Sequence, residues 1–166
     1  MNILTAEDGI KGSNLTETMQ KAHIDFCRFL TDNGFSIEPE KDGNGWQILY
    51  KNELIGHMNF SREFMGHDAA IWIDTCDFGG SDVADDALKE TAWAHVRVCE
   101  HFSSGGTQCG CGRQPGFSKT IFGKNFENLC FALLGFMNPD AKLLEDIKKL
   151  MLLFKQNRSN IGRVER

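Results

Sequence analysis

The sequence has no long apolar run and no excess of positive charge. Its longest apolar stretch, Phe131 to Met137, is far shorter than the roughly 20 residues of a membrane-spanning helix. The formal net charge of -5 argues against a general affinity for nucleic acid or for an anionic membrane. The opening MNILTAEDGIKG has no basic segment leading into an apolar one, so it does not resemble a signal peptide. We therefore expect a soluble, cytoplasmic protein.

Several catalytic signatures are also missing. The sequence around Gly123-Lys124 does not match a phosphate-binding loop, because that pattern needs Gly at Ser118 and Ser or Thr at Asn125. It contains no HExxH motif, zinc-deaminase signature, nucleophile elbow or dinucleotide fingerprint. These absences favour a binding domain, and a zinc-dependent hydrolase or a thiol redox enzyme is the alternative.

The composition is that of an ordinary globular protein. The chain has 166 residues, of which 41% are hydrophobic and 25% are charged, and this is enough for one domain with a core. It contains neither an internal repeat nor a low-complexity linker. We predict a single domain over residues 1–166, with frayed ends at about 1–13 and 157–166.

The N-terminal half changes its apolar period from 3.6 to 2. A stripe from Leu15 to Leu30 predicts a helix, which Asn14 and Glu17 begin as a capping box and Asn33-Gly34 ends. Alternating segments then predict strands at 35–37, 46–50, 54–60 and 69–76. A tight turn at Lys51-Asn52 and short connections favour an antiparallel meander.

The C-terminal half is predicted to be mainly helical. One helix is expected from Ser81 or Asp82 to Cys99, a second from about Asn125, and a third from Asn138-Pro139-Asp140. The fold class that follows is α+β: a three- to four-stranded antiparallel meander packed against helices. A cysteine-rich loop is expected between the C-terminal helices.

Four of the six cysteines lie between positions 99 and 130. In a reducing compartment, clustered thiols indicate metal ligands, a redox pair or small core residues. Structural zinc sites are closed sets of four thiolate or imidazole ligands. Cys99, Cys109, Cys111 and Cys130 supply such a set, with His101 in reserve, and we therefore predict a structural zinc. A redox role for Cys109 and Cys111 and simple core packing stay open.

Aromatic residues follow the predicted strands. Trp46, Tyr50 and Trp72 are candidates to line a ligand cleft, although packing in the core is the commoner use of such residues. A cleft beside them would suit a sensor of small apolar ligands. The leading hypothesis is a non-enzymatic domain that binds a ligand or a protein partner and contains a structural zinc.

The segment KTIFGKNF (Lys119–Phe126), followed by Cys130 and then Asn138-Pro139-Asp140, resembles part of a bacterial family of small cytosolic proteins. The resemblance covers roughly residues 20–155. It implies a tryptophan-containing meander, a helix and a cysteine-rich loop that suggests a metal site at Cys99, Cys109, Cys111 and Cys130. That family has no assigned activity, so the resemblance implies none here.

Overall fold

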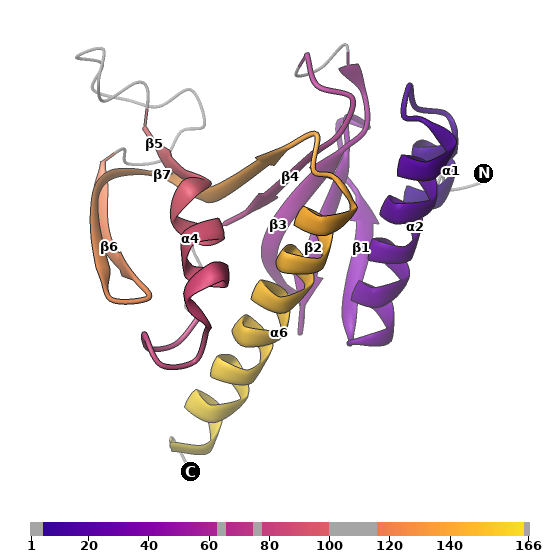
Figure 1. The fold of residues 1–166 in the computed structure, drawn as a ribbon. Helices are drawn as coiled ribbons and strands as arrows, with labels where there is room; N and C mark the ends of the chain where they lie inside the picture. Colours follow the sequence, from indigo (N-terminus) through magenta and orange to yellow (C-terminus); the bar gives the residue numbers. More distant parts are fainter. Residues whose placement is uncertain (1–4, 63–65, 75–77, 100–115, 165–166) are drawn as a thin grey trace. The chain divides into compact units, whose positions relative to one another are not determined.

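The computed structural model describes residues 5–62, 66–74, 78–99 and 116–164, with side chains through Arg158. In this part of the chain the helices are α1 (Ala6–Lys11), α2 (Glu17–Asp32), α4 (Asp86–Ala94) and α6 (Ala141–Val164) (Figure 1). The strands are β1 (Phe35–Pro39), β2 (Trp46–Tyr50), β3 (Glu53–Asn59), β4 (Ala70–Ile73), β5 (Val96–Val98), β6 (Phe117–Ile121) and β7 (Lys124–Met137). The chain divides into two compact units: unit 1 comprises Met1–Ile73 and Phe136–Lys148, and unit 2 comprises Asp74–Gly135 and Lys149–Arg166.

The seven strands form one antiparallel sheet, so the predicted α+β class is confirmed. Their hydrogen-bonded order is β1-β2-β3-β4-β7-β5, and β6 pairs with β7. The predicted meander is also confirmed, because β1 to β4 are consecutive neighbours. The sheet is larger than expected, since β5, β6 and β7 were predicted as helix or left without an element.

The turn between β2 and β3 lies where the sequence placed it. Tyr50 pairs with Glu53, and the two residues between them, Lys51 and Asn52, have φ of 51° and 64°. Positive φ at both central positions is the geometry of a two-residue hairpin turn. A register shift between Ile48 and Leu49 marks a bulge beside Gly56, whose missing side chain lets the Trp72 carbonyl approach.

Helix α2 begins two residues later than predicted. Thr16 is its N-cap, and its side-chain oxygen accepts a hydrogen bond from the amide of Met19. The Asn14–Glu17 capping box was therefore wrong. The predicted end is confirmed: Asn33 is the C-cap and Gly34 has φ of 84°, the left-handed conformation that glycine adopts without strain.

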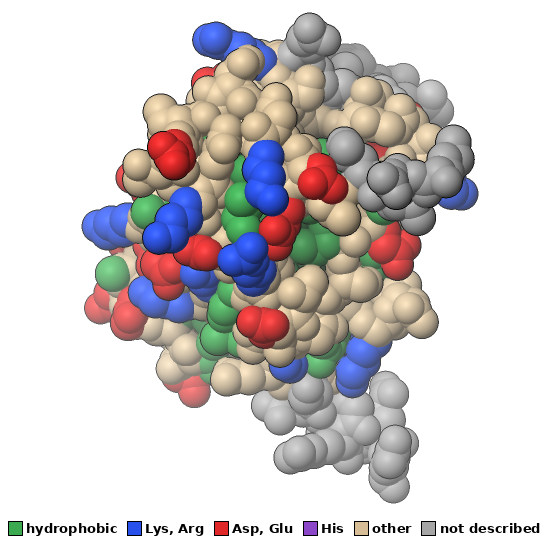
Figure 2. All heavy atoms as spheres, turned by 90° about the vertical axis from the view of Figure 1, so that its right-hand side faces the viewer, with side chains coloured by type: hydrophobic (Ala, Val, Ile, Leu, Met, Phe, Trp, Pro, Cys, Tyr) green, Lys and Arg blue, Asp and Glu red, His purple; other side chains and the backbone are tan. Residues whose placement is uncertain are grey.

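Helices α1 and α2 pack together in unit 1. The Arg28 guanidinium on α2 donates to both carboxylate oxygens of Glu7 on α1, at 3.0 and 3.3 Å. Residues 1–13 were predicted to be frayed, yet α1 lies there and buries Ala6 and Ile10. Figure 2 shows basic and acidic side chains interspersed on the side of the protein that carries these helices, as expected of a solvated surface.

The helix predicted from Asn125 is wrong, because residues 117–137 form the β6–β7 hairpin. Ile121 pairs with Lys124 across Phe122 and Gly123, which have φ of 47° and 82°. The Phe122 ring is buried against Phe78, with their centroids 5.8 Å apart, and this packing compensates a backbone conformation that phenylalanine rarely adopts.

The second predicted helix is shorter than expected at both ends. Asp85 is the N-cap of α4, in place of Ser81 or Asp82, and accepts a hydrogen bond from the Leu88 amide at 2.8 Å. The helix ends at Ala94, and Val96–Val98 form strand β5. Cys99 is therefore not at a helix end but directly after a strand.

The last helix begins close to its predicted start. Asp140 accepts from the Leu143 amide at 2.8 Å, whereas Asn138 exchanges two hydrogen bonds with Ala69 of the same unit. Helix α6 continues through Val164, beyond the predicted fraying at residue 157. None of the helices in the described ranges is long and apolar enough to cross a membrane.

Candidate functional site

Unit 1 contains a hollow of about 480 Å³. Three separate segments surround it: the end of α1 with the loop that follows, the β1–β2 loop with Trp46, and the residues directly after β3. Because two of these segments end regular elements, the walls expose backbone groups as well as side chains. The volume lies within the usual range for small-molecule sites.

Two aromatic rings form the apolar part of the hollow. Trp46 and Phe60 both line it, and their ring centroids are 5.7 Å apart at an interplanar angle of 48°. Only 9% of Trp46 and 5% of Phe60 is exposed. Gly9 on α1 lies against the outer ring of the Trp46 indole, where any side chain would overlap it.

Asn59 holds two walls of the hollow in place. Its side-chain amide donates to the Asn44 carbonyl in the β1–β2 loop, and its carbonyl oxygen accepts from the Ser61 amide at 2.7 Å. Asn44 and Ser61 both line the hollow, and Asn59 itself is only 4% exposed. A buried amide with both ends hydrogen-bonded gives this rim a fixed geometry.

The hollow has one acidic and one basic side chain on its lining, Asp8 and Arg62. The Asp8 carboxylate accepts from the Thr5 hydroxyl and backbone amide, at 2.6 and 3.1 Å. These hydrogen bonds hold the pKa of Asp8 below its usual value, so it stays negative at neutral pH. The exposed Arg62 lies 3.7 Å from Asp68.

His23 on α2 is a buried neighbour of this site. It is 0% exposed and meets Phe60 edge-on, with centroids 5.5 Å apart. Its Nδ1 lies 2.9 Å from the Met19 carbonyl, while Nε2 has no partner among the described residues. Burial lowers the pKa of His23, because the charged imidazolium would lose its hydration. Trp46 Nε1 is a second buried nitrogen without a partner in this part of the chain.

The three aromatic residues predicted for a cleft do not share one site. Trp46 lines the hollow, whereas Tyr50 is buried with its ring 5.1 Å from that of Phe35. Trp46 pairs with Met58 on β3, and Trp72 pairs with His57, the residue that precedes Met58 on the same strand. Since neighbouring strand residues face opposite ways, Trp72 lies on the other face of the sheet.

Most of the lining residues were not predicted. They lie in α1, which was predicted to be a frayed end, and in the loops before and after the meander strands. The usable signal was Thr5 followed three residues later by Asp8, which forms a capping box in the structure. The glycines at 9, 12 and 43 mark the other positions where backbone borders the hollow.

The structure describes two of the four proposed zinc-binding cysteines. The Cys99 amide donates to the Asn128 carbonyl at 2.7 Å, two residues before the half-buried Cys130 on β7. Cys109, Cys111 and His101 lie outside the described residues. Within the described ranges, no group of three or more His, Cys, Asp or Glu side chains is placed to hold a metal ion. The zinc site stays a prediction.

Comparison with known proteins gives no family for this chain: no family model, curated protein or solved structure matches it. The resemblance of the KTIFGKNF segment to a bacterial family also stays a prediction.

Proposed function

We propose that this protein is a ligand-binding domain that takes a small polar molecule into the hollow of unit 1. The observation that carries the proposal is the combination of two aromatic rings with polar groups from three chain segments around about 480 Å³. Small-molecule sites typically combine an apolar surface with a few fixed polar groups that orient the ligand. Trp46 and Phe60 supply the apolar surface. The polar groups come from Asn44, Ser61 and Asp8.

The charged lining groups favour binding over catalysis. General acid–base catalysis needs a group whose pKa lies near the operating pH. The pKa of Asp8 is lowered by its hydrogen bonds to Thr5, and its carboxylate already serves as part of a helix cap. The Arg62 guanidinium is permanently charged and can orient a ligand but cannot exchange protons at neutral pH. We therefore propose a non-enzymatic role.

A fragment screen by NMR tests this function. Small polar fragments are added to ¹⁵N-labelled protein, and the backbone amides of Ser13, Asn44 and Ser61 report on three sides of the hollow. At least one fragment is expected to shift all three amides together. A screen in which no fragment does so contradicts the proposal.

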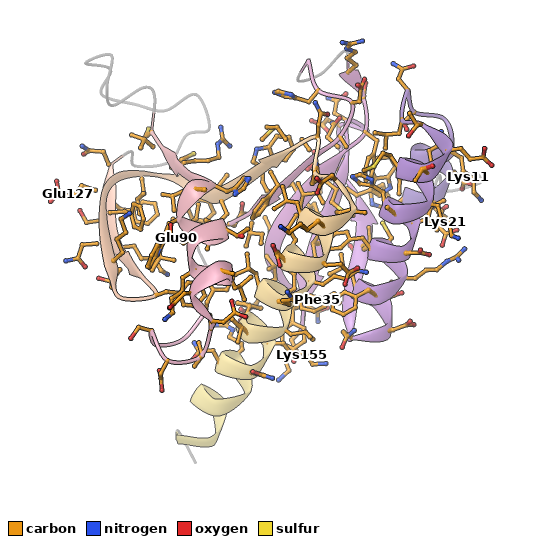
Figure 3. All side chains as sticks on the ribbon, in the orientation of Figure 1. Lys11, Lys21, Phe35, Glu90, Glu127 and Lys155 are labelled. Atoms are coloured by element: carbon orange, nitrogen blue, oxygen red, sulfur yellow. The ribbon has the colours of Figure 1, made fainter. Side chains whose placement is uncertain are left out.

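A variant that fills the hollow provides the control. Gly12 lines it, a Cβ there meets only backbone oxygens at 3.5 Å or more, and its φ of -83° suits any residue, so we expect Gly12→Leu to fold. Gly12→Leu is expected to abolish the fragment shifts. Lys21→Leu is the matched control, because Lys21, which is labelled on α2 in Figure 3, is exposed and is not among the residues that line the hollow. Equal binding by the two variants would place the fragment elsewhere.

A further inference from the structure

We infer that the ligand of the hollow is a neutral polyhydroxylated molecule, a sugar or a polyol, whose hydroxyls hydrogen-bond to the buried nitrogens of His23 and Trp46 beside Phe60. This inference rests on the proposed function and narrows it to one chemical class. It starts from two nitrogens, His23 Nε2 and Trp46 Nε1, which have no partner among the described residues. Buried polar groups normally have a hydrogen-bond partner, so each of these nitrogens requires an explanation.

The two nitrogens have opposite hydrogen-bonding roles. His23 Nδ1 faces the Met19 carbonyl at 2.9 Å, and because a carbonyl only accepts, Nδ1 carries the proton. In the neutral ring Nε2 is therefore an acceptor. Trp46 Nε1 is a donor and cannot accept. One buried donor and one buried acceptor thus lie next to the same aromatic residue, Phe60.

A hydroxyl is the ligand group that matches each nitrogen of this pair. Its oxygen accepts from an indole N–H and its proton is donated to an imidazole nitrogen, whereas a carboxylate only accepts and an ammonium only donates. The C–H faces of a sugar ring also suit an apolar surface such as that of Trp46 and Phe60. Asp8 and Arg62 on the lining have opposite charges, which favours a ligand without net charge.

Phe60 connects the pair of nitrogens with the hollow. It lines the hollow, and its centroid lies 5.5 Å from that of His23 and 5.7 Å from that of Trp46. Phe60 follows directly after the last residue of β3, so it lies outside the hydrogen-bonded pairing of that strand. A ligand hydroxyl must therefore reach the two nitrogens past the Phe60 ring. The competing occupant is an internal water, which has the same donor and acceptor capacity.

The test follows the indole N–H resonance of Trp46 in ¹⁵N-labelled protein. Three tryptophans give three such resonances, and the one missing from Trp46→Phe is assigned to Trp46. Glucose and inositol are the polyhydroxylated probes, and acetate, glycine and indole represent an anion, a zwitterion and an apolar molecule. Glucose or inositol is expected to shift the resonance in wild-type protein, and Gly12→Leu is expected to prevent the shift.

Two variants test the nitrogens directly. Loss of one hydrogen bond is expected to weaken binding of the polyhydroxylated probe about three- to tenfold in His23→Leu. Trp46→Phe retains an aromatic ring without the donor and should weaken binding by a similar factor, measured on the Ser61 amide. Tyr50→Phe removes a hydroxyl outside the hollow and should leave binding unchanged. The backbone spectrum of each variant verifies that it is folded.

The remaining outcomes separate the two proposals. If acetate, glycine or indole shifts the Trp46 resonance and the polyhydroxylated probes do not, the ligand class is wrong and the binding function stands. If no probe shifts it and the indole proton shows only a contact to water, an internal water occupies the pair and the inference is overturned. Failure of the broader fragment screen would in addition overturn the binding function.

Discussion

The backbone of Gly9 lies directly against the indole ring of Trp46, so closely that a methyl group on Gly9 would overlap the ring. Gly9 stands inside α1, where glycine normally costs up to about 1 kcal/mol relative to alanine. A residue that weakens its own helix is expected where the packing leaves no space for a side chain. The contact places α1 over Trp46 and so forms one side of the hollow.

Gly9→Ala is therefore expected to destabilise the protein by about 1–3 kcal/mol, because overpacking outweighs the gain in helix propensity. Urea denaturation gives the free energy of unfolding. Gly12→Ala is the matched control, since its Cβ would lie at ordinary contact distance, 3.5 Å from the Asp8 carbonyl. If both alanine variants are as stable as the wild type, the close contact of α1 with Trp46 does not exist in solution.

His23 is expected to make the protein less stable at acid pH. Its pKa is lowered in the folded state by burial, so below about pH 6.5 the unfolded chain binds a proton that the folded chain does not. Its contribution to stability is thus complete above that pH and falls by at most about 1.4 kcal/mol for each pH unit below it. Urea denaturation at pH 7.5 and 5.5 measures the loss. His23→Leu should lose less stability over this interval than Lys21→Leu, and an equal loss would show that His23 does not contribute.

Cys27 is expected to be inert in the native protein. Burial raises its pKa to about 12, so almost no thiolate is present at pH 8. Iodoacetamide labelling followed by peptide mass spectrometry should leave Cys27 unmodified under native conditions and modify it fully in urea. Labelling of Cys27 in the native protein at the rate seen in urea would contradict its burial.

The β6–β7 turn gives a prediction about backbone conformation. Gly123 has φ of 82°, and a Cβ there would lie 3.2 Å from the Ser81 Cβ. Gly123→Ala is expected to cost about 1 kcal/mol or more, because alanine avoids positive φ. Gly123→Asn should cost less, since asparagine tolerates this conformation better. Thermal unfolding ranks the two variants, and the reverse order would argue against the turn geometry.

The predicted structural zinc is tested by a chemical measurement. Protein purified without chelators is expected to contain about one zinc per chain, the stoichiometry of a closed site with four ligands. Cys109→Ser and Cys130→Ser should each remove it, and chelation should lower the melting temperature because metal binding contributes to folding. If the protein contains no metal and all six thiols titrate after denaturation, these cysteines are not zinc ligands.

The sequence predicted the elements whose signals are local. The β2–β3 turn at Lys51-Asn52 and the end of α2 at Asn33-Gly34 are set by residues that tolerate positive φ. Alternation along Trp46–Tyr50 is clear because one face of that strand is more deeply buried than the other. These patterns need no knowledge of distant residues.

Strand β7 was missed because its pattern depends on partners elsewhere in the chain. Asn128 has φ of 56°, and the pairing with β6 shifts by one residue near this point, which interrupts the alternation of apolar positions. Further along, Leu133 and Leu134 are consecutive and both fully buried. Side chains buried on both faces of a strand give no period of two, so the apolar residues fitted a helical stripe.

The hollow could not have been predicted from sequence, because its walls come from three segments that no local rule brings together. Trp46 was one of the aromatic candidates and it lines the hollow, but its position against Gly9 follows from how α1 packs. Asn59 was not identified either, since a buried amide that connects Asn44 to Ser61 has no sequence signature.

The division of the chain also constrains the order in which the protein is completed during synthesis. Unit 1 contains Met1–Ile73 but also needs Phe136–Lys148, and unit 2 needs Lys149–Arg166. The chain is synthesised from its N-terminus. Residues 1–73 therefore leave the ribosome well before Phe136–Lys148, the segment that completes their unit. Neither unit is complete until most of the chain has emerged. Truncation at any single position would therefore leave both units or one of them without a segment, and a nascent chain stalled before residue 136 would expose the apolar surface that this segment covers.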